Sequence, residues 1–318
     1  MACVNRCEQP RPSRRQILAS AIFFGPSAGV GQQSPPAAWE RRLRQSVALF
    51  PGTVGLFAKN LDTGAAFGIG ENERVRTAST IKVAIMVGVF AAVAEGRARW
   101  EEEIVLRESD KVGGSGVVRE LSGGVRLPLR DLVHLMIVVS DNTATNLVLD
   151  RISGDAVNRE MAKLGLEQTR VLRKILGGGK DVKPTPSGWT EAGRRPENQR
   201  FGIGVSTPRE MVLLFEKIER GEAVSAEASR EMIEILKRQQ YRDGIGRRLG
   251  SLPVASKSGA LDRLRSDAGI VYASGGRLAI AVTCDDLPEV DYSPDNIGNR
   301  FISRVTGLLL EGLAAKQG

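Results

Sequence analysis

Residues 77–94 read TASTIKVAIMVGVFAAVA, which places a serine and a lysine three residues apart at the start of a long apolar run. The run at 83–94 is too short to cross a membrane and is typical of a buried core helix. Lysine is almost never fully buried unless it is paired or used in chemistry. The stretch therefore predicts a core helix over about 79–95, and it singles out Lys82 as a residue whose position needs a reason.

Strands open and close the chain, and helices fill its middle. Strands at 52–60 and 66–70 are expected to form a hairpin around the turn DTG. Further strands are expected at 253–258, 266–273 and 277–284, and further helices at 38–50, 129–139, 142–152, 156–164 (N-capped by Asp155), 208–220, 226–240 and 296–315. This order predicts an α+β fold, in which a five-stranded antiparallel sheet from both termini is flanked by helices and carries an inserted all-helical subdomain.

The first 33 residues have the composition of an export signal. Arginines precede the short apolar stretch ILASAIFF at 17–24, and small residues follow it. SRRQIL at 13–18 resembles the twin-arginine signal, which is an address read by a receptor and not an anchor. We therefore expect an exported, periplasmic or secreted protein without a stable membrane anchor. The alternative is a disordered basic tail.

The remaining residues, 34–318, are expected to form one domain. Its α/β part spans about 39–78 and 241–318, and its helical part spans about 79–240. Within the helical part, the segment 177–208 is rich in glycine, proline and charge and lacks periodicity. Loops of this length in a compact domain are often functional.

Composition argues against several classes of function. The net charge is +8, but aromatic residues make up 5% of the chain and no basic patch is interleaved with them, so nucleic-acid binding is not expected. Cys3 and Cys7 lie in the expected signal, which leaves Cys284 alone in the exported protein and allows no disulfide framework. Cys284 follows the apolar stretch RLAIAVT and is predicted to be a buried strand thiol.

The single histidine of the chain, His134, lies in the apolar helical stretch DLVHLMIVV and is predicted to be a core residue. A Ser-His-Asp triad is therefore not expected, because nothing near His134 in sequence supplies a nucleophile. A zinc site with several histidine or cysteine ligands is not expected either.

Ser79 and Lys82 have the spacing of a nucleophile and its base. Serine needs a base to remove its proton, and lysine can be that base when burial or a neighbouring cation lowers its pKa. At i and i+3 the two side chains share a helix face and can touch. The positive end of the helix dipole would favour the developing alkoxide. The alternative is an N-cap serine beside a lysine that extends along the core surface to solvent.

Two further short stretches carry chemistry. SDN at 140–142 lies at a junction between two expected helices, where its alternative role is to cap a helix. VASKSGA at 254–260 places Lys257 and Ser258 near the end of a strand. Its alternative role is that of an edge strand protected from aggregation by a lysine.

These three motifs, taken in this order, resemble the S-x-x-K, S-D-N and K-T-G signature of class A β-lactamases and penicillin-binding serine hydrolases. In this chain serine replaces the threonine of the last motif. The resemblance covers the chain from about residue 39 onward and is specific because three motifs coincide. It implies a β-lactamase/transpeptidase-like fold, a monomer, and an acyl-enzyme mechanism without a metal ion or organic cofactor.

The resemblance also implies roles in acylation. Ser79 would attack the lactam carbonyl, and Lys82 would accept its proton. Ser140 would relay a proton to the leaving nitrogen. The backbone N–H groups of Ser79 and Ala260 would form the oxyanion hole.

The resemblance implies substrate-binding roles for four further residues. Asn142 would hold the side-chain amide of the substrate, and Lys257 and Ser258 would bind its carboxylate. Gly259 would let the substrate backbone lie along the strand, because it has no Cβ.

One part of the family pattern is missing. Class A enzymes have an arginine, one residue, a glutamate that activates the deacylating water, and an asparagine four residues further on. In TRVLRKILGGGK, Arg173 matches the arginine, Ile175 stands at the glutamate position and Gly179 at the asparagine position. An isoleucine cannot activate water. Glu191 and Glu197 in the following loop are candidate substitutes, and the alternative is that both are solvated loop carboxylates.

The expected function is that of a serine β-lactamase-type hydrolase that acts on a β-lactam or peptidoglycan-like small molecule. One alternative is a penicillin-binding D-Ala-D-Ala peptidase or esterase that deacylates lactams slowly. A non-enzymatic alternative is a lactam or peptidoglycan sensor.

Overall fold

The computed structural model describes residues 37–176 and 188–315. The expected export signal, Cys3, Cys7 and Gly179 lie outside these ranges, as does the part of the 177–208 segment up to residue 187.

The centre of the fold is a five-stranded antiparallel sheet in the order β2-β1-β10-β9-β8. The predicted hairpin is formed by β1 (Thr53–Asn60) and β2 (Ala66–Ile69). The other three strands are β8 (Val254–Leu261), β9 (Leu264–Ala273) and β10 (Gly276–Asp285). β1 pairs with β10 along its whole length, from Thr53↔Asp285 to Asn60↔Leu278. The predicted sheet from both ends of the chain is therefore confirmed, and β8 is one of its edges.

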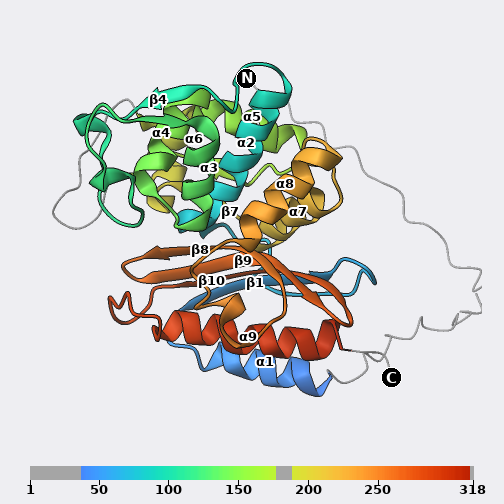
Figure 1. Cartoon of the computed structure of the whole chain (residues 1–318). Coiled ribbons are helices and arrows are strands. Elements are labelled where there is room, and N and C mark those ends of the chain that lie inside the picture. Colours follow the sequence, from blue (N-terminus) through green and yellow to red (C-terminus); the bar gives the residue numbers. More distant parts are fainter. Residues whose placement is uncertain (1–36, 177–187, 316–318) are drawn as a thin grey trace, which may run out of the picture. The chain divides into compact units, whose positions relative to one another are not determined.

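Helices cover both faces of the sheet (Figure 1). On one face, α1 (Ala38–Ala48) and α9 (Ile297–Leu313) pack side by side over an apolar layer that includes Leu56, Cys284 and Phe301. Cys284 is fully buried in β10, as predicted for a strand thiol, and burial raises its pKa. The other face carries α7 (Pro208–Glu219), and α8 (Ala226–Lys237) packs against β8.

The helical part is built around α2 (Lys82–Ala94), whose residues are buried from Lys82 to Ala92. A helix that is apolar on all sides belongs in the interior. Its neighbours are α3 (Leu129–Val138), α4 (Asn142–Ile152) and α5 (Gly154–Lys163). The predicted start of this core helix was wrong by one turn. Ser79 lies in the 3₁₀ helix η1 (Ala78–Ile81), and the α-helix begins at Lys82.

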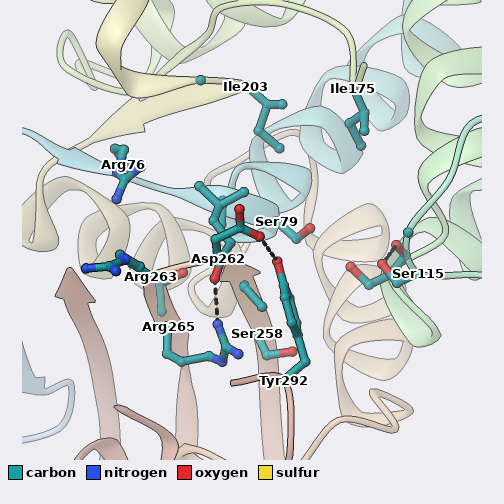
Figure 2. Close-up of a pocket in the computed structure, with 18 of the residues that line it drawn as sticks. Arg76, Ser79, Ser115, Ile175, Ile203, Ser258, Asp262, Arg263, Arg265 and Tyr292 are labelled. Atoms are coloured by element: carbon teal, nitrogen blue, oxygen red, sulfur yellow. Dashed lines mark hydrogen bonds between the residues drawn. The ribbon is translucent and has the colours of Figure 1, made fainter. Parts of the chain in front are cut away.

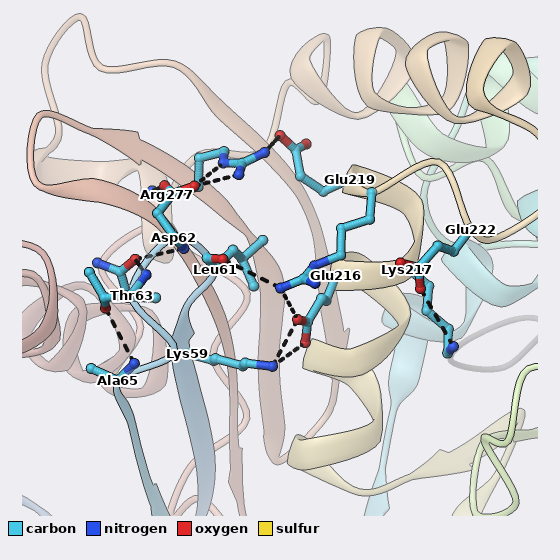
Figure 3. A network of polar contacts seen from close by, with 12 residues as sticks. Lys59, Leu61, Asp62, Thr63, Ala65, Glu216, Lys217, Glu219, Glu222 and Arg277 are labelled. Atoms are coloured by element: carbon cyan, nitrogen blue, oxygen red, sulfur yellow. Dashed lines mark hydrogen bonds and ion pairs between the residues drawn. The ribbon is translucent and has the colours of Figure 1, made fainter.

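Ionic contacts fix α7 on the sheet (Figure 3). The carboxylate of Glu216 accepts hydrogen bonds of 2.8 Å from Lys59 on β1. Arg277 on β10 donates to Glu219 at 3.2 Å and to Asp62. Glu216 and Glu219 lie one turn apart on α7, so one face of this helix is held by residues from two strands.

Two other local predictions need correction. Ser153, not Asp155, precedes the first residue of α5, and Asp155 instead accepts the backbone N–H of Glu191 at 2.8 Å. His134 is only half-buried in α3, because it lies at the border of the apolar face. Burial and the nearby Arg238 lower its pKa.

Several short elements were not predicted, because two to six residues carry too little periodicity. They are β3 (Val75–Arg76), β4 (Glu103–Val105), β5 (Arg126–Pro128), β6 (Arg170–Val171), β7 (Gly204–Ser206), α6 (Glu191–Arg194), η2 (Glu108–Asp110), η3 (Val118–Glu120), η6 (Pro196–Phe201) and η7 (Ile245–Arg248). In ranges 37–176 and 188–315, no helix has both the length and the hydrophobicity needed to cross a membrane.

Candidate active site

A cleft of about 1290 Å³ lies where the helical part meets the edge of the sheet. Six of the residues expected at the site line it: Ser79, Ser140, Asn142, Ser258, Gly259 and Ala260. Two more of them, Lys82 and Lys257, are fully buried side chains. Figure 2 shows Ser79 and Ser258 close to each other in this cleft, with Ile175 on the opposite wall. The three sequence motifs therefore meet in one place.

The turn that carries Ser79 is held against the edge strand β8. Ala78 enters it with φ 47°, a left-handed conformation that is costly for a residue with a Cβ and often found at functional sites. The carbonyl of Thr77 accepts a hydrogen bond of 2.8 Å from Ser266 Oγ on β9. A Cβ at Gly259 would lie 2.9 Å from both the backbone N of Ser79 and the carbonyl O of Thr77.

The packing of the protein therefore requires a glycine at position 259, in addition to the role toward a substrate that was expected from the sequence. Only a glycine lets β8 approach the serine turn this closely, since a Cβ below 3.0 Å from backbone atoms would force one of the two segments to move. The close approach places Ala260, the next residue of β8, beside Ser79 on the wall of the cleft.

Lys82 is fully buried and directed at the SDN motif. Its Nζ lies within hydrogen-bond distance of the carbonyl O of Ser140 at 2.6 Å, Oδ1 of Asn142 at 3.0 Å and Oγ of Ser140 at 3.2 Å. Burial, and secondly the charge of Lys257, hold the pKa of Lys82 well below its usual value. A lysine that extends to solvent is excluded, and a neutral amine able to accept a proton is favoured.

The SDN motif is folded into a strained turn. Ser140 has φ 55°, again left-handed, and its carbonyl accepts a second hydrogen bond, from Ser115 Oγ at 2.9 Å. The side chain of Asn142 is engaged at both ends. Its Oδ1 accepts from Lys82, and its Nδ2 donates to the carbonyl of Gly113 at 3.0 Å.

Asp141 holds this turn in place, and it fills the helix-capping role that was the alternative for the SDN motif. Its Oδ1 caps α4 by accepting the N–H of Ala144 at 2.8 Å. Its Oδ2 accepts the N–H groups of Val117 at 2.6 Å and Val118 at 2.8 Å. The aspartate in SDN, between the serine and the asparagine, is the signal that marks it, since aspartate is a preferred N-cap.

Lys257 lies on the edge strand β8, where an exposed lysine could protect against aggregation. Its side chain is, however, fully buried. Its Nζ donates to the carbonyl of Ser258 at 2.8 Å. Burial lowers its pKa to about 7, and the charge of Asp267 opposes that shift. Solvent protection of the edge therefore does not explain this lysine.

Arg263 and Arg265 also line the cleft, and the guanidinium of Arg265 is held by hydrogen bonds within the protein. Arg265 is 3% exposed, and its guanidinium donates to the carbonyls of Leu261 at 2.7 Å and Leu264 at 2.6 Å. It also lies over the ring of Tyr292, at 4.8 Å from the centroid. Arg263 is exposed on the turn between β8 and β9 and lines the cleft.

The wall that would carry a deacylation base is apolar at the decisive position. Ile175 lines the cleft and is 8% exposed. Asn146 fixes its backbone, because Oδ1 accepts the Ile175 N–H and Nδ2 donates to the Ile175 carbonyl, each at 2.8 Å. Arg173 lies 5.6 Å from the ring centroid of Trp189, and burial lowers its pKa.

The structure does not bring Glu191 or Glu197 to this cleft. Both line a second cavity of about 520 Å³, together with Arg74 and Arg159. The carboxylates that do line the cleft, among the residues the structure describes, all belong to the segment 243–286: Asp243, Asp262, Asp267 and Asp286. Within the same ranges, no group of three or more potential metal ligands occurs.

Comparisons with known proteins agree with the geometry. The model of the beta-lactamase enzyme family matches residues 38–313. A curated β-lactamase of Streptomyces cellulosae is 32% identical over 160 residues, 49% of this chain, and the match spans only about half (50%) of that relative.

Solved structures cover more of the fold. A β-lactamase from Sphaerobacter thermophilus is 32% identical with a TM-score of 0.73, over 86% of this chain and 95% of that one. PBP-A is 26% identical with a TM-score of 0.71, over 86% and 94% of the two chains. A leucine-to-glutamate mutant of PBP-A, solved as an acyl-enzyme with penicillin G, is 27% identical with a TM-score of 0.72, over 86% and 95%. The chain therefore belongs to the beta-lactamase enzyme family.

Proposed function

We propose that this protein is a serine hydrolase that opens β-lactams by acylation of Ser79 and releases the product slowly. The observation that carries the proposal is the contrast between two walls of one cleft. On the acylation side, the buried Lys82 is hydrogen-bonded to Ser140, and Ser79 lines the same cleft as Ser140. The opposite wall has an isoleucine where a water-activating carboxylate would be needed.

In the proposed reaction, Ser79 Oγ attacks the carbonyl carbon of the lactam while its proton passes to the neutral amine of Lys82. The N–H groups of Ser79 and Ala260 stabilise the oxyanion of the tetrahedral intermediate. The carbon–nitrogen bond then breaks, and the nitrogen takes a proton through Ser140, whose Oγ lies 3.2 Å from Lys82 Nζ. The products are an ester on Ser79 and an amine on the opened ring.

Lys257 and Ser258 would bind the substrate carboxylate in this scheme, and Asn142 would hold the side-chain amide. One N–H of Asn142 Nδ2 is donated to the carbonyl of Gly113 at 3.0 Å, which leaves the second N–H for the substrate. Hydrolysis of the ester needs an activated water, and neither Glu191 nor Glu197 lies in the cleft to supply it.

A second candidate is a D-Ala-D-Ala peptidase or esterase that uses the same residues. The same apolar wall at Ile175 favours it, because an enzyme working on reactive or peptide substrates does not need to release a penicilloyl group quickly.

The test is the intact mass of the purified protein, followed over time after mixing with benzylpenicillin. We expect a rise by one penicillin that lasts for minutes or longer, and no adduct on Ser79→Ala. An adduct on Ser79→Ala would remove Ser79 from its role. A wild-type adduct that vanishes within seconds would contradict slow release, and the absence of any wild-type adduct would contradict acylation by lactams.

We also propose export through the twin-arginine-like segment. The support is the order of charge and apolarity in residues 1–33, which the structure does not describe. Replacing Arg14 and Arg15 by lysine should retain the protein in the cytoplasm of the producing cell, whereas unchanged periplasmic or secreted protein would contradict the proposal.

A further inference from the structure

The floor of the cleft holds a buried carboxylate that the proposed reaction does not use. Asp267 lies on β9 directly opposite Ser258 on β8, is 2% exposed, and lines the cleft. Its Oδ2 accepts the backbone N–H of Ile245 at 2.9 Å, and its Oδ1 has no hydrogen-bond partner. A buried polar atom without a partner costs free energy, so this position calls for a reason.

Asp267 borders the cleft, and its Oδ1 is buried there without a hydrogen-bond partner. A Cβ at Gly244 would lie 2.5 Å from Oδ2, so the segment before η7 closes that side tightly. β10 places the apolar Val282 opposite Asp267 on the third side. Residues directly opposite in an antiparallel pair have Cβ atoms about 4.5–5.5 Å apart and share a face of the sheet. Asp267 therefore shares its face with Ser258, the hydroxyl expected to meet the substrate carboxylate.

Two charged groups act on Asp267, Lys257 from β8 and Asp243 from the segment before η7. Burial raises the pKa of Asp267 to about 7, with Lys257 opposing and Asp243 adding to the rise. Burial lowers the pKa of Lys257 to about 7. Near neutral pH the two groups thus share one proton, either as an ion pair or as a neutral pair, and the net charge of the pair is zero.

We propose that Asp267 takes up a proton when an anionic substrate binds, and that its Oδ1 then donates a hydrogen bond to the substrate carboxylate. The inference rests on the proposed function, because it takes Lys257 and Ser258 as the carboxylate site. A second anion beside Asp267 disfavours its charged form. A protonated carboxyl group has an O–H donor, and the unpartnered Oδ1 is the atom that carries it. Asp267 is in this sense a positioning and specificity-determining residue.

The consequence is a preference that depends on pH and on substrate charge. Carboxylate-bearing substrates bind with the uptake of one proton, so they lose reactivity as the pH rises above 7. Substrates whose carboxyl group is esterified bring no negative charge and do not need that proton. The ratio of the two acylation rates removes the titration of Lys82, which both substrates share. Lys257 also loses charge above pH 7, so the comparison of the wild type with Asp267→Asn separates the contribution of Asp267 from that of Lys257.

The test compares benzylpenicillin with its methyl ester, using the second-order rate of acylation from intact mass between pH 5.5 and 8.5. In the wild type, the acid-to-ester ratio should fall by up to about tenfold per pH unit above pH 7, as a one-proton dependence requires. In Asp267→Asn, a neutral amide of similar shape donates at every pH, and the ratio at pH 8.5 should be at least about fivefold above the wild-type ratio. A ratio equal to or below that of the wild type would overturn the inference. Asp286→Asn is the matched control, since Asp286 is an exposed carboxylate on the same cleft, and it should keep the wild-type profile.

A second measurement does not depend on the folding of Asp267→Asn. Ser79→Ala binds benzylpenicillin without reacting, and calorimetry in two buffers of different ionisation enthalpy counts the protons exchanged. At pH 8 we expect uptake of about one proton per benzylpenicillin and none per methyl ester. No uptake with benzylpenicillin would overturn the inference while acylation of Ser79 stands. If neither compound acylates the wild type, the proposed function fails, and the proton count still decides the inference.

Discussion

Replacing Asp141 by alanine should cost more stability than almost any other change of one polar side chain in the helical part. Asp141 is 1% exposed, and its two oxygens accept three backbone N–H groups, those of Ala144, Val117 and Val118. Loss of the helix cap costs about 1 kcal/mol. The two other N–H groups would be left without a partner, at about 1–3 kcal/mol each. The expected loss in the free energy of unfolding is therefore about 3–7 kcal/mol.

The assay is urea unfolding followed by tryptophan fluorescence, with Asp150→Ala as the matched control. Asp150 lies in the same helix but pairs with Lys174 at the surface, where its side chain is 51% exposed. An exposed ion pair contributes about 0–1 kcal/mol, so this variant should lose less than about 1 kcal/mol. If the two variants lose the same stability, the three hydrogen bonds of Asp141 do not support the turn that carries Ser140, and the reasoning is refuted.

Three further predictions concern the chemistry of the cleft. Gly259→Ala should lower the rate of acylation by about 100-fold or more, because a Cβ 2.9 Å from Ser79 N displaces an oxyanion donor. Gly307→Ala is the control and should leave the rate unchanged, since a Cβ there meets nothing within 4 Å. Stopped-flow acylation by benzylpenicillin measures both variants, and equal rates would contradict the steric argument. Ile175→Glu should shorten the lifetime of the penicilloyl adduct by at least tenfold, because it places a water-activating carboxylate at the deacylation position. Ile203→Glu, on the same cleft, should not shorten it. If a mass time course shows an equal effect for both, an added negative charge anywhere in the cleft would explain it, and the position of Ile175 would not be special. The pKa of Lys82 is lower in the folded than in the unfolded chain, so the unfolded state holds the extra proton between the two values and stability rises with pH, by up to about 1.4 kcal/mol per unit until about pH 10. Lys82→Met should reduce this slope in urea unfolding between pH 7 and 9, and an unchanged slope would mean that Lys82 stays charged when folded.

The longer helices and strands were predictable from the sequence, and so were the residues that carry the motifs. The apolar run after Lys82 is typical of an interior helix, and the three strands predicted at 253–258, 266–273 and 277–284 each overlap an observed strand. The meeting of Lys82 with Ser140 and Asn142 followed from the resemblance, since nothing in their spacing of about 60 residues brings them together.

What escaped prediction depends on contacts between distant segments. The short α-helical start expected at Ser79 became a 3₁₀ turn, because the close packing of Gly259 holds the backbone there. A helix cap was an alternative for SDN, but the bonds of Asp141 to Val117 and Val118 were not predicted, nor was the burial of Asp267 at the cleft. Glu191 and Glu197 were candidates on chemistry alone, and the fold directs both toward another cavity.

The strand order β2-β1-β10-β9-β8 has a consequence for how the protein is made. β1 is the first strand to leave the ribosome, yet the neighbour that completes it is β10, more than 200 residues later. Contacts of such sequence separation fold slowly and leave intermediates with unpaired strand edges. During synthesis the hairpin of β1 and β2 must therefore wait, with the inner edge of β1 open, while the helical part is already free to collapse around α2. A truncation that removes Gly276–Asp285 would leave that edge open permanently, and aggregation rather than a smaller active enzyme is the expected product.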